Sequence, residues 1–181
     1  HLLAIGLDAL GMTNFASKVA SSEKAHKTPL LLFMGRIVKQ KGMQFLVGLE
    51  GGKNILERLI LEARADGKDI KFVFIGEPGD SVGEEVYRSL LKLQADYPAN
   101  IFVRGKIKGG TQEWSMLLKG ADLEIMPSIA EPRGMANLEA IAGGTPVVGP
   151  DLEGLRTGII DFDKDPEHGN GFKWDPKFTA D

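Results

Sequence analysis

Short apolar runs alternate with helix-forming patterns along most of this chain. Candidate strands cover residues 30–34, 70–75, 101–104, 123–126 and 146–148, and candidate helices cover 43–49 and 55–65. Strands that alternate with helices in this way predict a parallel sheet with helices on both faces. We therefore expect an α/β fold, a doubly wound parallel sheet of the Rossmann-like kind.

Three more helical segments and one short strand complete the pattern. Val86, Leu90, Leu93 and Tyr97 fall on one helical stripe, and a shorter stripe follows at Trp114, Leu117 and Leu118. Residues 135–141 favour helix once it has started. We expect residues 161–170 to form a charged surface loop, residues 171–174 a final strand, and residues 50–53 an interruption between the first two helices.

Composition agrees with one globular domain and excludes several classes of partner. The chain has 181 residues, of which 43% are hydrophobic and 26% charged, which is ordinary for a domain of this size. A net charge of -3 offers no overall attraction to nucleic acid or to an anionic membrane surface. The chain has no cysteine, no apolar run of transmembrane length and no signal-peptide pattern at its start. We expect a cytoplasmic protein with no nucleic-acid or membrane partner.

The segment from Glu131 to Glu139 has the features of a ligand site. Pro132 and Gly134 suit a loop that enters a helix. The first turn of such a helix carries partial positive charge and unpaired N–H donors, which suit a phosphate. Carboxylates accept hydrogen bonds well from sugar hydroxyls. The segment therefore offers a place for a diphosphate and two acceptors for hydroxyl groups, although both glutamates could instead be helix-associated surface charges.

A second candidate site follows the strand at 30–34, where Arg36 and Lys41 lie on a glycine-flanked loop. Two cations at a strand end can neutralise a diphosphate and stabilise it as a leaving group. Two solvated charges are the alternative. The three histidines, His1, His26 and His168, show no metal-ligand spacing. We expect no metal and no cofactor.

Together these motifs resemble the retaining glycosyltransferases of the GT-B architecture, which has two Rossmann domains, and most closely the glycogen and starch synthases. The resemblance runs from about residue 30 to 172. It rests on five ordered elements: Gly35-Arg36 followed by Lys41-Gly42, the strand ending in Pro127-Ser128, Glu131-Pro132-x-Gly134-Met135, Glu139, and Gly144-x-Pro146-Val147-Val148. Several motifs in order are far more specific than any one of them alone.

The resemblance implies a role for each matched residue. Arg36 and Lys41 would hold the diphosphate together with the helix start at Gly134, Met135 and Ala136. Glu131 would contact the transferred sugar near its reacting carbon, and Glu139 would hold the ribose hydroxyls. Lys106 falls where the family contacts the base. Gly154 belongs to the family's phosphate-binding glycine turn, although Glu153 stands in place of that turn's first glycine.

The resemblance also implies that this is one half of an enzyme. We expect residues 1–28 to be a link between domains, and 29–181 to be the nucleotide-sugar-binding domain, truncated at its C-terminal end. The donor would be ADP-glucose or UDP-glucose and the product an extended α-1,4-glucan, with the acceptor held by a missing N-terminal domain, so that the fragment alone is inactive. Alternatives are a sucrose-type or lipopolysaccharide-type glycosyltransferase, a sugar epimerase, or a non-catalytic nucleotide-binding or glycan-binding module.

Overall fold

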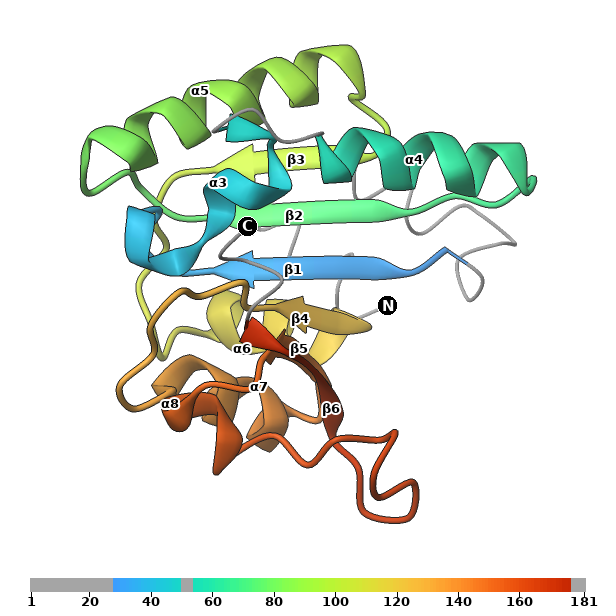
Figure 1. The fold of residues 1–181 in the computed structure, drawn as a ribbon. Coiled ribbons are helices and arrows are strands. Elements are labelled where there is room, and N and C mark those ends of the chain that lie inside the picture. Colours follow the sequence, from blue (N-terminus) through green and yellow to red (C-terminus); the bar gives the residue numbers. More distant parts are fainter. Residues whose placement is uncertain (1–27, 50–53, 177–181) are drawn as a thin grey trace.

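A computed structural model describes residues 28–49 and 54–176, which form a parallel sheet with helices on both faces (Figure 1). The six strands are β1 (Leu30–Met34), β2 (Lys71–Ile75), β3 (Ile101–Arg104), β4 (Leu123–Ile125), β5 (Val147–Pro150) and β6 (Gly171–Trp174). They lie in the order β3-β2-β1-β4-β5-β6, and each neighbouring pair is parallel. The predicted doubly wound α/β fold is confirmed.

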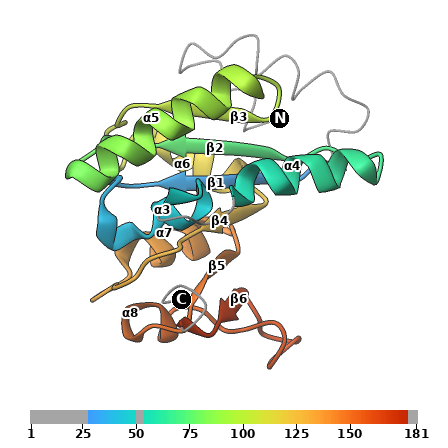
Figure 2. The same ribbon diagram turned by 45° about the horizontal axis from the view of Figure 1, so that its top comes forward.

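The helices fall into two groups along the chain. The first group is the 3-10 turn η1 (Lys39–Lys41), α3 (Met43–Leu46), α4 (Ile55–Ala65) and α5 (Ser81–Asp96), and the second is α6 (Gln112–Gly120), α7 (Met135–Gly143) and α8 (Glu153–Arg156). Figure 2 shows α5 and α8 near opposite ends of the sheet. The first group packs on one face of the sheet and the second on the other.

Two apolar clusters, one on each face, hold the layers together. Phe33, Phe72 and Phe74 of the sheet pack with Leu56 of α4 and Leu90 of α5. On the other face, Leu32, Val73 and Val147 pack with Leu117 of α6 and Ala140 of α7. Successive strand residues point to opposite faces, so strands buried on both sides read as continuous apolar runs.

Side-chain caps fix where three helices begin. Asn54 accepts a hydrogen bond from the Glu57 N–H at 3.1 Å, and Asp80 accepts one from the Gly83 N–H at 2.7 Å. Asp80 also accepts from the Lys39 N–H at 2.9 Å, which ties the start of α5 to the loop after β1. Thr111 caps α6. Each cap satisfies an N–H group that the helix itself leaves unpaired.

Most predicted elements match to within two residues, and the differences have local causes. The helix expected at 43–49 ends at Leu46, because Gly48 adopts the left-handed region, with φ of 74°. In the 161–170 loop Asp161 is buried and its backbone bridges Gly171, so the expected surface loop is anchored at its first residue. The predicted link at 1–28 and interruption at 50–53 lie almost wholly outside the described residues.

Within the described ranges, no helix is long and apolar enough to cross a membrane.

Candidate functional site

The loops that follow β1 and β4 are joined at the carboxyl edge of the sheet. Gly42 has φ of 70°, and a β-carbon there would overlap the Pro127 carbonyl oxygen. Glycine adopts this conformation without strain and leaves room for the close contact. The Ile129 N–H donates to the Gln40 carbonyl at 2.8 Å, and the Gln40 side-chain amide donates to the Ala130 carbonyl at 2.9 Å. The two loops therefore hold each other in place.

This contact brings together two of the predicted site residues, Lys41 and Glu131. The Lys41 ammonium forms an ion pair with the Glu131 carboxylate, and the Ser128 hydroxyl donates to the same carboxylate oxygen at 3.2 Å. Both side chains are largely buried, with exposed fractions of 18% and 11%. An ion pair with so little solvent around it is screened much less than one on the surface. A cation and a carboxylate are thus placed side by side where two motifs far apart in sequence converge.

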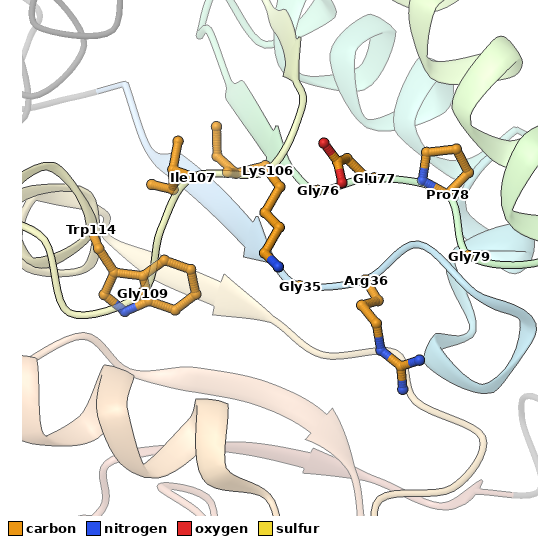
Figure 3. Close-up of a pocket in the computed structure, with 11 residues that line it drawn as sticks. Gly35, Arg36, Gly76, Glu77, Pro78, Gly79, Lys106, Ile107, Gly109 and Trp114 are labelled. Carbon is orange, nitrogen blue, oxygen red and sulfur yellow. The ribbon is translucent and has the colours of Figure 1, made fainter.

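Arg36 and Lys106 line a neighbouring cavity of about 300 Å³ (Figure 3). Its apolar wall includes Ile75, Ile107 and Trp114. Figure 3 shows the cationic ends of Arg36 and Lys106 extending to the same side of the cavity, whereas the Glu77 carboxylate points the other way. The two cations therefore lie in different parts of the site: Arg36 borders the cavity, and Lys41 is paired with Glu131.

Helix α7 begins beside this region. Gly134 precedes it in the left-handed conformation with φ of 61°, and no N-cap side chain accepts from its first turn. Met135, in that turn, is exposed, and Ala136 is half buried. The sequence prediction that this helix start meets a ligand remains a prediction, but its geometry leaves the N–H groups without a side-chain cap.

Gly154, at α8, packs tightly against the loop that carries Glu131. A β-carbon at Gly154 would overlap the Glu131 carbonyl oxygen, and one at Gly134 would overlap the Gly154 carbonyl oxygen. Both glycines are buried. Close backbone packing is therefore sufficient to require glycine at position 154, whatever its predicted contact with phosphate.

Glu139 lies apart from Glu131. It is exposed on α7 and lines a second cavity of about 380 Å³ between α6 and α7, together with Thr111, Trp114 and Lys119. Trp114 borders both this cavity and the one that holds Arg36. Glu131 thus pairs with Lys41, whereas Glu139 borders the cavity between α6 and α7.

Two buried polar residues near the site were missed by sequence analysis. Glu124 of β4 is only 1% exposed, and burial raises the pKa of its carboxyl to about 8; the Lys41 charge opposes this shift and Glu139 adds to it. Asn137 of α7 is fully buried. Among the described residues, one carboxylate oxygen of Glu124 and both amide atoms of Asn137 have no hydrogen-bond partner. A charged residue inside an apolar strand was the available signal for Glu124.

No group of three or more potential metal-binding side chains gathers within residues 28–49 and 54–176.

The sequence profile of the family described as "Glycosyl transferases group 1" matches residues 14–181. The chain is 33% identical over 144 residues to the glycogen synthase of Alkalilimnicola ehrlichii, an alignment that covers 80% of this chain and 26% of that enzyme. It is 27% identical to the glycogen synthase of Hydrogenobaculum sp., of which it spans 30%. The chain thus spans less than a third of these curated relatives.

Solved structures of the same architecture superpose on the chain. The sucrose-phosphate synthase of Thermosynechococcus elongatus matches with a TM-score of 0.57 and 25% identity, over 91% of this chain and 37% of that one. The catalytic domain of Starch Synthase IV from Arabidopsis thaliana, bound to ADP and acarbose, matches with a TM-score of 0.60 and 22% identity, over 92% and 34%. The predicted resemblance to glycogen and starch synthases and to the GT-B fold is confirmed.

Proposed function

The chain belongs to the group 1 glycosyl transferases, and from this premise we propose that it forms the donor-binding part of a glycogen-synthase-like or starch-synthase-like enzyme. The donor would be ADP-glucose or UDP-glucose, and the product an α-1,4-glucan longer by one glucose. The observation that carries the proposal is the convergence of Lys41 and Glu131 beside the cavity that Arg36 borders. A diphosphate and a sugar need such neighbouring cationic and carboxylate groups.

In this proposal the leaving nucleoside diphosphate is the group that the site stabilises. The bond from the reacting carbon of glucose to the diphosphate oxygen breaks, and an acceptor hydroxyl forms the new bond on the same face. The hydroxyl proton would pass to the departing diphosphate oxygen. Arg36, Lys41 and the first turn of α7 would offset the charge that develops on the diphosphate. No metal or cofactor is required for that task.

Lys41 must exchange partners for this to happen. In the structure its charge faces Glu131. A bound diphosphate would draw the ammonium toward phosphate oxygens and leave Glu131 to meet the sugar and the positive charge at its reacting carbon. Glu139 would accept hydrogen bonds from the ribose hydroxyls, as the family resemblance implies; it borders a cavity that Trp114 also lines.

The acceptor would come from another domain. Reactions of this kind take place in a cleft that closes around donor and acceptor and excludes water. We propose that the chain by itself binds the donor nucleotide but transfers no glucose. Robust glucan elongation by the purified chain would contradict this half-enzyme proposal.

A sucrose-type glycosyltransferase is the second candidate. The similarity to sucrose-phosphate synthase, at 25% identity over 91% of this chain, favours it. The two candidates share the donor site and differ in the acceptor, so a longer protein containing this chain should be assayed with a glucan and with a fructose phosphate as competing acceptors.

Titration calorimetry of the chain with ADP and UDP tests the donor site. Lys41→Ala should weaken binding by roughly 1–3 kcal/mol, the range for removing a hydrogen bond to a charged group. Lys68→Ala is the matched control, because Lys68 is exposed in the turn after α4 and forms a surface ion pair with Asp66 at 3.6 Å. Equal affinity in the wild type and in Lys41→Ala would remove Lys41 from the site.

A further inference from the structure

Asn137 is a buried polar residue that packing alone does not explain. It is the third residue of α7, and its side chain is fully buried. Neither its amide oxygen nor its amide nitrogen has a hydrogen-bond partner among the residues that the structure describes. Two unpaired polar atoms away from water cost free energy, and native proteins rarely retain them without a reason. An apolar side chain would avoid that cost.

The amide of Asn137 lies between two backbone segments. A β-carbon at Gly134, the residue before α7, would overlap the Asn137 Oδ1 atom. A β-carbon at Gly158, which follows α8, would overlap the Nδ2 atom. Because neither glycine has a side chain, the amide lies directly against both backbones, with its oxygen toward the start of α7 and its nitrogen toward the chain after α8.

The same two segments also meet at Gly154, which packs on the loop that carries Glu131. The backbone contacts there are too close for a β-carbon at either Gly154 or Gly134. Groups packed at this density do not move independently. Asn137 therefore adds a side-chain bridge between α7 and residues 153–158, which we call the α8 segment, to a backbone contact that already joins them.

The oxygen of Asn137 is placed to complete the start of α7. No N-cap side chain accepts from the first turn of this nine-residue helix. A side chain at the third helical position can reach back and accept from the N–H of the residue before the helix. The Asn137 oxygen faces that residue, Gly134, but accepts no hydrogen bond there. An uncapped helix start with an unpaired, fully buried amide beside it is arranged for a change on ligand binding.

We propose that Asn137 is a positioning residue that couples diphosphate binding at the start of α7 to the α8 segment, an inference that rests on the proposed function. When the diphosphate accepts from the first-turn N–H groups, the backbones on both sides close on the amide. Its oxygen then accepts from the Gly134 N–H, and its nitrogen donates to a backbone carbonyl of the α8 segment. Asn137 does not touch the ligand, but the two bonds that its amide gains add to the affinity for diphosphate.

Replacing Asn137 by Leu separates this coupling from a structural role. Leucine has the same branching and no polar group, so the ligand-free variant should melt no lower than the wild type. In calorimetry its affinities for ADP and for inorganic pyrophosphate should both fall by at least about fivefold, because the effect acts through the diphosphate. Pyrophosphate should slow amide hydrogen exchange in the α8 segment of the wild type and not in the variant.

Asn100→Leu is the matched control. Asn100 is also buried, but its amide nitrogen donates to the Asp69 carboxylate at 2.6 Å and to the Ile70 carbonyl at 2.8 Å. This substitution removes bonds that the fold already has, so it should lower the melting temperature. Asn100 precedes β3 at the opposite edge of the sheet from the site, and pyrophosphate affinity should therefore stay within about twofold.

Gly158→Ala perturbs the amide from the other side. Its new methyl group would overlap Asn137 Nδ2, so it should also weaken pyrophosphate binding. In an Asn137→Ala background that overlap is gone, and the same substitution should have a much smaller effect. The two changes should thus be non-additive in a double-mutant cycle. Additive losses of affinity would show that Asn137 does not link the two segments.

The outcomes distinguish this proposal from the proposed function. A wild-type chain that binds neither ADP nor UDP contradicts the proposed function itself. If the wild type binds ADP, a folded Asn137→Leu variant with wild-type affinity overturns the coupling alone. A variant that loses melting temperature as Asn100→Leu does, together with affinity, assigns Asn137 to the fold and also overturns the coupling. If Asn137→Leu fails to fold, the cycle between Asn137→Ala and Gly158→Ala decides.

Discussion

Replacing Glu124 by Gln should make the chain more stable in alkaline solution and change the pH dependence of its unfolding. The carboxyl is buried in β4, and burial raises its pKa from 4.5 to about 8. Between these two pH values the unfolded chain has lost a proton that the folded chain keeps. The free energy of unfolding of the wild type should therefore fall as pH rises from about 4.5 to about 8 and level off above that.

The size of the effect follows from the two pKa values. Each pKa unit corresponds to 1.36 kcal/mol, so the free energy of unfolding of the wild type should fall by roughly 5 kcal/mol between the two pKa values. Glutamine has nearly the same shape and no proton to release. Burying its uncharged amide has a cost that does not vary with pH. The titration of Glu124 is therefore seen in the slope of the free energy of unfolding against pH, and not in its absolute value.

Urea unfolding followed by circular dichroism at intervals from pH 5 to pH 9 measures these slopes. Glu62→Gln is the matched control, because Glu62 is 63% exposed on α4 and pairs with Arg58 on the surface at 3.4 Å. The control should follow the wild type at each pH. A Glu124→Gln variant whose stability also follows the wild type from pH 5 to pH 9 would refute the argument that this buried carboxyl titrates near pH 8.

Three further results are expected. Gly42→Ala should lower the free energy of unfolding by more than about 2 kcal/mol, because it adds a clash with Pro127 to a strained φ. Gly67→Ala is the control, since Gly67 has φ of 67° and open space around it. That variant should lower the free energy of unfolding by only about 1 kcal/mol in the same urea titration. Hydrogen bonds from the Gly83 and Lys39 N–H groups hold the pKa of the Asp80 carboxyl below its usual value, so Asp80→Ala should lower the melting temperature at pH 7. The difference in melting temperature between wild type and variant should shrink as pH falls through that lowered pKa. An unchanged difference at pH 2 would count against the cap. Glu139→Ala should weaken the binding of ADP and of ADP-glucose by similar factors in calorimetry. Glu131→Ala in a longer, active protein should reduce turnover strongly and leave ADP affinity near the wild-type value. Loss of ADP binding in Glu131→Ala would show that the roles of the two glutamates are wrongly divided.

The strands were predictable because their signals are local. The strands at 30–34 and 101–104 were predicted at the bounds they have, since each is a short apolar run next to a turn-forming residue. Helix ends were predicted less well, because a residue such as Gly48 can end a helix by its backbone conformation alone. Parallel order also followed from alternation of strands and helices, but the register of each pair did not.

The site was predictable in its residue types and not in its pairings. Lys41 and Glu131 were both expected at a ligand, but their ion pair depends on the contact between Gly42 and Pro127, two residues far apart in sequence. Trp114 was assigned only to the core stripe, since nothing in its own segment indicates that its ring borders two cavities. Long-range packing decides such features, and one sequence does not record it.

The order of strands in the sheet has a consequence for how the protein acquires its site during folding. β1 pairs with β2 on one side and with β4 on the other, and the Leu30 N–H donates to the Asp122 carboxylate across 92 residues of chain. Contacts so distant in sequence carry a large loop-closure cost and form slowly. Lys41 belongs to the first half of the sheet and Glu131 to the second, so we expect an intermediate with unpaired halves to bind no nucleotide. A nucleotide that binds only the completed sheet would in turn slow the exchange of amide hydrogens between β1 and β4, because these strands could separate only after the nucleotide had been released.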